Sequence, residues 1–388
     1  MHIGIIGAGH AGVEAARVAR EAGAEVTLFS AEDVLPYYRP RLVAVAFGQA
    51  EQSAILLRPA EWYAAQGINL RLNTPVMAID LTARTVEAGG VTQAFDGLIV
   101  ASGALPVLPP FARDAGPAVW PLWNAAHASG IRPRVRVGGR IVVVGGGILG
   151  IEAALRALDA GMEVTIVELM DRLMPAQFGA RASAVLLRRL EDRHIRVFLG
   201  HGVKAVAADS QTARLTLDDG HVLEADLCLV SIGSRPDTTL AMLAGLDTDR
   251  GITTDHYLQT RYAGCFAAGD AIQLEGLTRC SMKEATTQGK VAATNLAAFL
   301  QGRGLQFYLA ETSPLMFRAK DFEIYSIGHP GGIGYEDHLL EGATESVIRT
   351  LVMKDGIPLG VQMIGSREGF DEYAASVKQG RAAGTTRA

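Results

Sequence analysis

Two glycine-rich loops are the residues whose types and spacing point most directly to chemistry. They are Gly7-Ala8-Gly9-His10-Ala11-Gly12 and Gly145-Gly146-Gly147-Ile148-Leu149-Gly150, and both match G-x-G-x-x-G. Each lies between an apolar run and an Ala-rich stretch, as a strand-to-helix turn requires. The glycines then serve the turn, the approach of a pyrophosphate to the helix N-terminus, and helix–strand packing. One copy alone could be a plain tight turn, but the repeat predicts two dinucleotide sites.

A carboxylate near the end of the second strand of each unit is suited to bind a ribose. Glu168 has this place in the second unit, and Glu32, followed by Asp33, is the candidate in the first. A carboxylate accepts hydrogen bonds from ribose hydroxyls and repels a 2′-phosphate, for which Leu169 and Met170 offer no arginine. The second site is therefore predicted to bind NADH in preference to NADPH, unless Glu168 is merely an exposed strand end. The sensible pairing is a tightly held FAD with an exchanging NAD(H).

The elements that must position these groups follow an α/β pattern. Strands alternate with Ala-rich helices in both glycine-loop units, and alternating strands dominate after about residue 313. An Asp355-Gly356 pair indicates a hairpin turn there. The expected strands are 3–6, 25–29, 76–79, 97–101, 140–144, 163–168, 323–328 and 347–352, with a further strand-to-loop signal at 265–270. The expected helices are 13–22, 59–66, one from the second glycine loop to about 160, and about 287–300, and a polar tail is expected from Gly380.

Length and composition are compatible with several globular domains. The chain has 388 residues, 49% of them hydrophobic and 20% charged, so ample core material is present and wholesale disorder is excluded. Together with a Pro-rich crossing at 105–110, the pattern predicts two Rossmann-like domains plus a small C-terminal α+β domain. The predicted boundaries are 1–110 with 232–310 for a discontinuous FAD-binding domain, 111–231 for an NAD-binding domain, and 311–388 for the C-terminal domain.

Charge and cysteine content narrow the function classes. The formal net charge of -5 gives no general footprint for nucleic acid. No leader pattern and no long uncharged apolar run is evident, so no membrane partner is expected. Cys228, Cys265 and Cys280 are widely spaced, which fits a reduced, cytoplasmic protein and no metal site. The first two lie in apolar settings that favour buried structural thiols.

A series of further motifs resembles the pyridine nucleotide-disulfide oxidoreductase superfamily of two-dinucleotide flavoproteins. The sequence is most similar to its NADH:rubredoxin oxidoreductases and to the diaphorase part of NADH-dependent nitrite reductases. The resemblance covers nearly the whole chain and implies an enzyme that binds FAD and NADH. Besides the glycine loops, the matching segments are 38–42, 98–106, 231–236, Ala268-Gly269-Asp270 and Gln288-Gly289.

The resemblance implies roles for individual residues. Asp270 is expected to bind the ribityl chain of the flavin, although an N-cap is its structural alternative. Arg39 and Pro40 are expected along the flavin, and Glu152 near the nicotinamide, unless it only stabilises its helix N-terminus. Arg39 and Glu152 are thus the catalytic candidates. The cofactor-binding residues are predicted as Gly7, Gly9, Ala11, Gly12, Glu32, Arg39, Pro40, Val76, Ala101, Ser102, Gly103, Gly145, Gly147, Leu149, Gly150, Glu168, Gly233, Gly269, Asp270 and Gln288.

Two departures from the family refine the expected function. Disulfide-reducing members carry redox cysteines on the helix after the first unit, but 42–48 contains none, so thiol chemistry there is excluded. Ferredoxin-reductase relatives usually place a lysine shortly after the Arg-Pro segment, where this chain has Ala44. These differences favour hydride transfer from NADH to FAD and then one-electron transfer to a small acidic carrier such as rubredoxin.

Several alternatives stay open at this stage. An NADH oxidase using O2 needs no partner protein, and a flavin diaphorase subunit would work inside a larger redox complex. A flavoprotein used for signalling or binding is a third possibility. Arg132, Arg134, Arg136 and Arg140 lie just before a predicted strand. They form either a solvated linker or a surface that steers an acidic carrier. The oligomer is expected to be a monomer or a homodimer.

Overall fold

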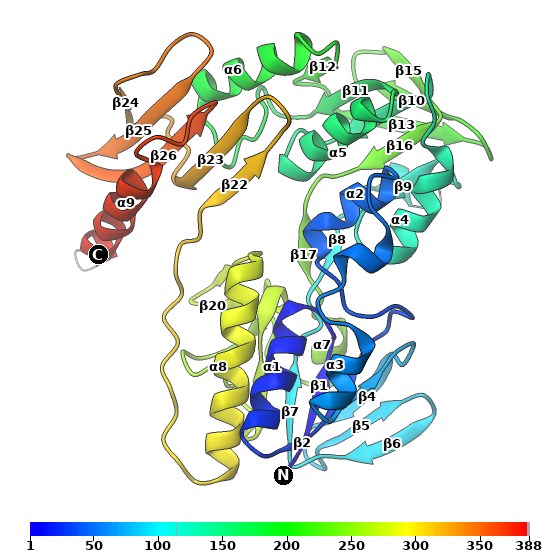
Figure 1. Ribbon diagram of the computed structural model, residues 1–388, viewed down its shortest axis with the longest axis vertical. Coiled ribbons are helices and arrows are strands. Elements are labelled where there is room, and N and C mark those ends of the chain that lie inside the picture. The colour runs from blue at the N-terminus through cyan, green and yellow to red at the C-terminus, as the bar shows by residue number, and fades with distance from the viewer. Residues whose placement is uncertain (114, 386–388) are drawn as a thin grey trace. The chain divides into compact units, whose positions relative to one another are not determined.

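The computed structural model describes residues 1–113 and 115–385 (Figure 1). Residue contacts divide the chain into two compact units. The first contains 1–42, 50–106 and 234–311, and the second contains 43–49, 107–233 and 312–388. This division is coarser than the predicted domains, whose boundaries stay predictions.

The core of the first unit is a parallel sheet with strand order β19-β7-β1-β2-β3. Its strands are β1 (His2–Ile6), β2 (Glu25–Phe29), β3 (Ile68–Arg71), β7 (Gly97–Val100) and β19 (Cys265–Ala267). They are near-continuous apolar runs because a parallel sheet is buried on both faces. The helices α1 (His10–Glu21) and α8 (Met282–Leu300) pack against each other beside this sheet. Their close contact at Gly289 is possible because a Cβ there would lie 2.1 Å from the Ala11 carbonyl oxygen.

Smaller elements complete the first unit. An antiparallel sheet has the order β4-β5-β6, and β17 pairs with β8 in antiparallel fashion. These and the remaining elements are β4 (Val76–Asp80), β5 (Thr85–Ala88), β6 (Val91–Ala94), β8 (Ala104–Pro106), β17 (Ser234–Pro236), β18 (Ile252–Thr253), β20 (Ile272–Leu274), β21 (Leu277–Thr278), α3 (Ala60–Ala65) and α7 (Thr239–Leu243).

The second unit repeats this design. A parallel sheet with order β12-β11-β10-β16-β9 forms its centre, and an antiparallel sheet β13-β14-β15 accompanies it. The elements are β9 (Val119–Pro121), β10 (Arg140–Val144), β11 (Glu163–Glu168), β12 (Arg196–Leu199), β13 (Val203–Ala208), β14 (Ala213–Leu217), β15 (Val222–Ala225), β16 (Leu227–Val230), α2 (Leu42–Ala46), α4 (Ala125–Ile131), α5 (Ile148–Asp159) and α6 (Ala180–Glu191).

The C-terminal part of the second unit is an antiparallel sheet with order β22-β23-β26-β25-β24. One face packs on α9, and β26 packs on α6. The predicted hairpin turn joins β25 to β26, and both Asp355 (φ 52°) and Gly356 (φ 74°) have positive φ. The elements are β22 (Leu315–Arg318), β23 (Glu323–Gly328), β24 (Glu336–Leu339), β25 (Ile348–Lys354), β26 (Ile357–Ile364) and α9 (Phe370–Thr385).

Several sequence-based boundaries are wrong, and one of them is the start of α1, which begins at His10 rather than at residue 13. The polar tail expected from Gly380 is helical as far as Thr385, and residues 386–388 of that tail lie outside the described part. Gly380 does not end a helix but allows close packing, since a Cβ there would lie 2.4 Å from the Pro358 carbonyl oxygen. Helix α8 begins at Met282 rather than at residue 287. In its first turns, the hydroxyls of Thr286 and Thr287 donate hydrogen bonds to the backbone carbonyl oxygens four residues earlier.

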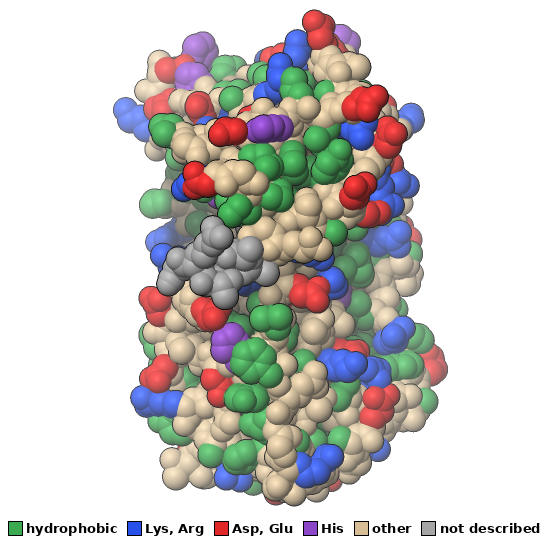
Figure 2. All heavy atoms as spheres, turned by 90° about the vertical axis from the view of Figure 1, so that its left-hand side faces the viewer, with side chains coloured by type: hydrophobic (Ala, Val, Ile, Leu, Met, Phe, Trp, Pro, Cys, Tyr) green, Lys and Arg blue, Asp and Glu red, His purple; other side chains and the backbone are tan. Residues whose placement is uncertain are grey.

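The described surface shows no single dominating charge on the face drawn in Figure 2, where acidic and basic side chains are interspersed. None of the described helices is both long and apolar enough to cross a lipid bilayer.

Candidate cofactor sites

The first glycine loop has the geometry that its spacing predicts. Gly7 has φ +104°, and a Cβ on it would lie 2.1 Å from the Ala101 carbonyl oxygen. A Cβ on Gly12 would lie 1.8 Å from the Gly7 carbonyl oxygen, so any side chain would push helix α1 off the turn. Gly9, by contrast, faces open space, with no atom within 4 Å of a built Cβ. This leaves room for a phosphate to approach the helix N-terminus.

The second glycine loop reproduces this geometry almost atom for atom. Gly145 has φ +112° and would place a Cβ 2.2 Å from the Ser231 carbonyl oxygen, while Gly150 would place one 2.1 Å from that of Gly145. Gly147 faces open space, as Gly9 does. The neighbouring Leu149 is half-buried near the start of α5. The two loops are therefore equivalent cradles that fit a pyrophosphate.

Glu168 is held rigidly at the end of β11. Its Oε2 accepts a 2.6 Å hydrogen bond from the Gly146 N–H, and its Oε1 accepts one of 2.8 Å from the Met170 N–H. The residue is only 8% exposed. Each carboxylate oxygen can accept a further hydrogen bond, so the group is oriented in advance for two ribose hydroxyls.

Glu32 lies in a different environment beyond the end of β2. Its Oε2 accepts a 2.7 Å hydrogen bond from the Tyr37 hydroxyl, and its Oε1 lies 3.2 Å from the Arg39 guanidinium. Arg39 also lies over the Tyr37 ring and begins a short 3-10 turn that includes Pro40. The fold thus joins two predicted site residues, Glu32 and Arg39, through an ion pair.

Asp270 fits the flavin role that the resemblance implies. Burial raises the pKa of its carboxyl to about 6, against the lowering effect of the Arg39 charge. Its Oδ1 atom is buried and has no hydrogen-bond partner among the described residues. A buried acceptor of this kind is costly unless a ligand satisfies it. A hydroxyl of the FAD ribityl chain would supply a donor for this atom, and that contact stays a prediction.

Gln288 acts from inside the protein. Its Oε1 accepts a 2.8 Å hydrogen bond from the Gly269 N–H, and its Nε2 donates one of 3.2 Å to the Tyr308 hydroxyl. That hydroxyl lies 3.4 Å from Glu284 Oε2. The amide therefore fixes the Gly-Asp turn, and cofactor contact by Gln288 stays a prediction. Tyr308 and Glu284 belong to this network but carry no motif that sequence reasoning could have used.

His10 lies inside the first glycine loop but was not among the predicted site residues, and its environment makes it a further candidate. Burial lowers the pKa of its imidazole to about 4, and the Arg39 charge acts in the same direction. Its Nε2 is buried and has no hydrogen-bond partner among the described residues. The ring meets the edge of Tyr38, with 5.4 Å between ring centroids. A neutral imidazole at the N-terminus of α1 is thus available to the same ligand as Gly9.

Glu152 lies on α5, one turn from the start of that helix. Burial raises the pKa of its carboxyl, and Arg156, 4.0 Å away, opposes that rise. Arg156 also donates a 2.9 Å hydrogen bond to Gln49, in the segment that follows α2. Glu152 is therefore a carboxyl group whose pKa is raised by burial, and its catalytic role stays a prediction.

The remaining predicted residues serve mainly to shape the turns. Ser102 donates a 2.8 Å hydrogen bond to the Asp237 carbonyl oxygen, and Gly103 and Gly233 both have positive φ. Ala11 lies against Gly269 and Gly289. Ala101 directly follows β7, and Val76 is the first residue of β4.

Three of the four arginines at and just before the start of β10 make contacts within their own unit. Arg134 donates to the backbone carbonyls of Ser210, Gln211 and Asp226. The Asp226 carboxylate, only 9% exposed, lies 3.1 Å from Arg136 and 3.9 Å from Arg140. These contacts favour a structural role over the steering of a carrier.

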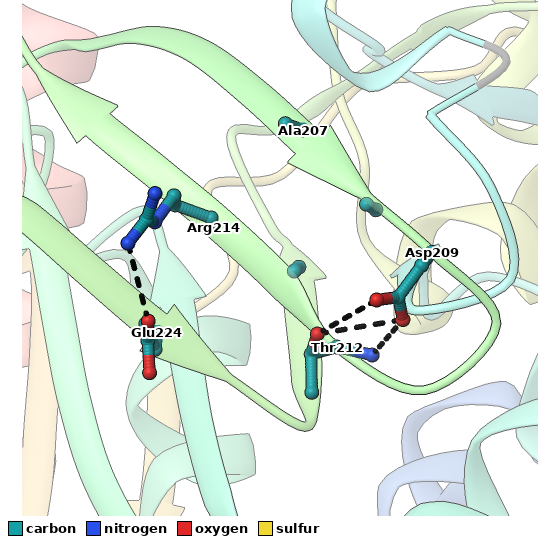
Figure 3. Close-up of a pocket in the computed structure, with 7 residues that line it drawn as sticks. Ala207, Asp209, Thr212, Arg214 and Glu224 are labelled. Carbon is teal, nitrogen blue, oxygen red and sulfur yellow. Dashed lines mark hydrogen bonds and ion pairs between the residues drawn. The ribbon is translucent and has the colours of Figure 1, made fainter.

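Cysteines and surface hollows add no second reaction centre among the described residues. Burial raises the pKa of the Cys228 thiol to about 12 and that of Cys265 to about 11. A hollow on the β13–β15 sheet is lined by Asp209, Thr212 and the Arg214–Glu224 pair (Figure 3). Asp209 accepts hydrogen bonds within its own turn, and none of the residues lining the hollow is a predicted cofactor ligand.

Comparisons with known proteins agree with this geometry. The sequence profile described as "Pyridine nucleotide-disulphide oxidoreductase" matches residues 1–293. Rhodocoxin reductase from Rhodococcus erythropolis is 32% identical over 374 residues, which cover 94% of this chain and 85% of that protein. Rubredoxin-NAD(+) reductase from Pseudomonas putida is 30% identical over 307 residues, covering 76% of this chain and 80% of that one.

A solved structure agrees as well. The covalent complex of putidaredoxin reductase with putidaredoxin matches with a TM-score of 0.86 and 25% identity, over 97% of this chain and 93% of the other. The fold class and the family expected from the motifs are both confirmed. On these grounds the chain belongs to the pyridine nucleotide-disulphide oxidoreductase family.

Proposed function

We propose that this chain is an FAD-dependent reductase that oxidises NADH and passes the electrons to a small redox protein of the rubredoxin or ferredoxin type. The observation that carries the proposal is the pair of equivalent cradles, each with its own acidic or unsatisfied polar groups. When bound, FAD supplies an acceptor that takes a hydride from NADH and returns electrons one at a time. The chain's own share is binding, orientation and electrostatics.

The residues of the second cradle support NADH as the donor. Glu168 offers a fixed negative charge to the adenosine ribose, so it favours free hydroxyls and repels a 2′-phosphate. Leu169 and Met170, which follow it, are both exposed and carry no positive charge. This part of the proposal concerns selectivity, and it can fail while the oxidoreductase activity stands.

Similar reductases support a protein acceptor. The named relatives reduce rhodocoxin or rubredoxin, and the matched solved complex contains putidaredoxin. The segment 42–48 carries no cysteine, so electrons cannot leave through a thiol at that place. We also propose a cytoplasmic location, in line with three thiols that form no disulfide among the described residues. The oligomeric state, monomer or homodimer, stays a prediction.

Anaerobic titration tests the proposal directly. The purified yellow protein should lose its flavin absorbance on addition of NADH, and more slowly with NADPH. Addition of oxidised rubredoxin or ferredoxin should then restore the flavin colour and reduce the carrier. Failure of either pyridine nucleotide to bleach the flavin would reject the dehydrogenase function. Reoxidation by air as fast as by any carrier would instead identify an NADH oxidase.

A larger complex is tested separately. If the isolated chain is bleached by NADH but reduces no carrier and reacts slowly with air, gel filtration with the products of neighbouring genes should be carried out. Co-elution that restores carrier reduction would identify a diaphorase subunit, and turnover by the chain alone would exclude that role.

A further inference from the structure

One face of the C-terminal sheet carries buried polar side chains. Gln362 on β26 is 2% exposed, and its cross-strand neighbours Ser326 on β23 and Thr350 on β25 are 3% and 2% exposed. Buried polar side chains need partners, and they hold a structure in one arrangement when they find them. The partners of two of these residues lie in the segment 169–179, which follows Glu168.

The contacts of Gln362 fix the end of that segment. Its Oε1 accepts a 3.0 Å hydrogen bond from the Gly179 N–H, and its Nε2 donates one of 2.7 Å to the Pro330 carbonyl oxygen. Gly179 is the N-cap residue of α6, and a Cβ on it would lie 3.0 Å from the same Pro330 oxygen. Nearby, the Ser326 hydroxyl donates a 3.2 Å hydrogen bond to the Gln177 carbonyl oxygen.

The other end of the segment is tied to the nucleotide cradle. Met174 has φ 49° and is fully buried, and its N–H donates a 3.0 Å hydrogen bond to the Gly146 carbonyl oxygen. The Leu173 side chain packs on Gly146, where a Cβ would lie 2.6 Å from its Cδ2. Gly146 in turn donates to Glu168. Between the two ends, Gln177 and Phe178 donate backbone hydrogen bonds to the Met174 carbonyl oxygen.

We propose that Gln362, assisted by Ser326, is a positioning residue for NADH: it holds the segment 169–179 so that Met174 fixes Gly146 and Glu168 stays oriented toward the adenosine ribose. The inference rests on the proposed function. It gives the C-terminal sheet a task in nucleotide selection, although no residue of that sheet belongs to a dinucleotide motif. A strained backbone at Met174 persists only while its surroundings hold it in place.

The main test is Gln362→Leu, which keeps a similar volume but leaves the Gly179 N–H and the Pro330 carbonyl unpaired. We expect the KM for NADH and the dissociation constant for NAD⁺ to rise roughly three- to thirtyfold, as for other residues that act through a network. The FAD content, the flavin spectrum and kcat at saturating NADH should not change. The preference for NADH over NADPH should narrow, because Glu168 loses its fixed orientation.

Two further variants separate positioning from general stability. Gln362→Glu keeps an oxygen for the Gly179 N–H, so its KM should lie between those of wild type and Gln362→Leu. Arg189→Gln removes a hydrogen bond from α6 to the Ser346 carbonyl oxygen, farther along the same contact. It should lower the melting temperature without changing the KM for NADH.

The inference fails if Gln362→Leu loses thermal stability while KM and NAD⁺ affinity stay at wild-type values, or if Arg189→Gln raises KM equally. Should Gln362→Leu not fold, Ser326→Ala removes only the hydroxyl contact to Gln177 and should raise KM by a smaller factor, and an unchanged KM there would also overturn it. A wild-type protein that NADH does not reduce would instead reject the proposed function itself.

Discussion

The two dinucleotide cradles share a backbone design but differ in how their polar groups are satisfied. In the second unit, both oxygens of Glu168 already accept backbone hydrogen bonds. In the first unit, His10 Nε2 and Asp270 Oδ1 are buried without partners among the described residues. Leaving a buried polar group unpaired costs roughly 1–3 kcal/mol. The Asp270 carboxylate of the first unit would therefore gain a partner from a ligand, whereas the Glu168 carboxylate of the second cradle is already held by the backbone.

This difference matches the two ways in which the cofactors are used. A site that needs its ligand for its own stability binds that ligand persistently, which suits FAD. A preorganised site with satisfied groups can bind and release a ligand repeatedly without local rearrangement, which suits NADH. Under the proposed function, the same loop geometry would serve a resident and an exchanging dinucleotide.

The largest expected effects come from adding one methyl group at equivalent turns. Gly7→Ala and Gly145→Ala both place a Cβ within about 2 Å of a carbonyl oxygen at a φ that favours glycine. We expect Gly7→Ala to be purified without FAD. Gly145→Ala should keep its FAD and be bleached by dithionite, but its reduction by NADH should fall at least a hundredfold. The flavin-to-protein absorbance ratio and anaerobic stopped-flow reduction measure the two outcomes.

Gly23→Ala is a suitable control, because Gly23 also has positive φ but meets no atom within 4 Å. It should lose some stability but keep its FAD and be reduced by NADH at the wild-type rate. A Gly145→Ala protein that loses FAD, or a Gly7→Ala protein that keeps it, would contradict the assignment of one cofactor to each cradle.

Asp270→Asn should have an effect of intermediate size. It should weaken FAD binding but stabilise the FAD-free protein. The amide is a weaker acceptor than a carboxylate, so FAD affinity should fall roughly ten- to hundredfold, the usual range for a hydrogen bond to a charged group. The FAD-free protein should become more stable near neutral pH, since a largely buried carboxylate is removed. Flavin fluorescence titration and thermal melts of the FAD-free protein measure the two effects.

The raised pKa of Asp270 determines how the stability of the FAD-free protein changes with pH. The pKa of Asp270 is about 6, above its ordinary value of 3.8, so folding favours the protonated form. Its contribution to stability is complete below pH 3.8 and is lost as the pH rises through 6, by up to about 3 kcal/mol. His10, whose pKa is lowered, acts in the opposite sense and loses stability as the pH falls. If the free energies of unfolding of wild type and Asp270→Asn change in parallel from pH 4 to 7, the Asp270 carboxylate is not the group that causes the pH dependence.

Sequence alone predicted the features that local rules determine. The glycine loops, their flanking strands and the hairpin at Asp355-Gly356 follow from turn geometry and apolar periodicity, and the structure contains all of them. Glu168 was also selected from its place at the end of a strand, where the structure holds it by two backbone hydrogen bonds, and its role at a ribose stays a prediction. Each of these predictions depends on residues close together in the chain.

The rest depends on contacts between distant segments. No local pattern shows that His10 loses a hydrogen-bond partner on burial, or that the Gln288 amide donates to Tyr308. The sequence predicts a polar tail from Gly380, whereas in the fold this residue lies within α9 and packs against Pro358 of β26. The bond from Gln362 to Gly179 joins residues 183 positions apart, so it becomes visible only when the fold is known.

The smallest effect is expected from changing Glu168, the carboxylate of the second cradle. Glu168→Gln keeps one acceptor oxygen but cannot accept from both the Gly146 and Met170 N–H groups while also serving two ribose hydroxyls. We expect kcat/KM for NADH to fall roughly tenfold, about the weight of one hydrogen bond, and that for NADPH to change little because the repulsion of its phosphate is also removed. FAD content should equal that of wild type.

Glu32→Gln is the matched change in the first unit, and it should weaken FAD binding while the KM for NADH stays constant. If the two variants exchanged these phenotypes, the assignment of FAD to the first cradle and NADH to the second would be reversed, because a ribose carboxylate acts only on the dinucleotide that it binds.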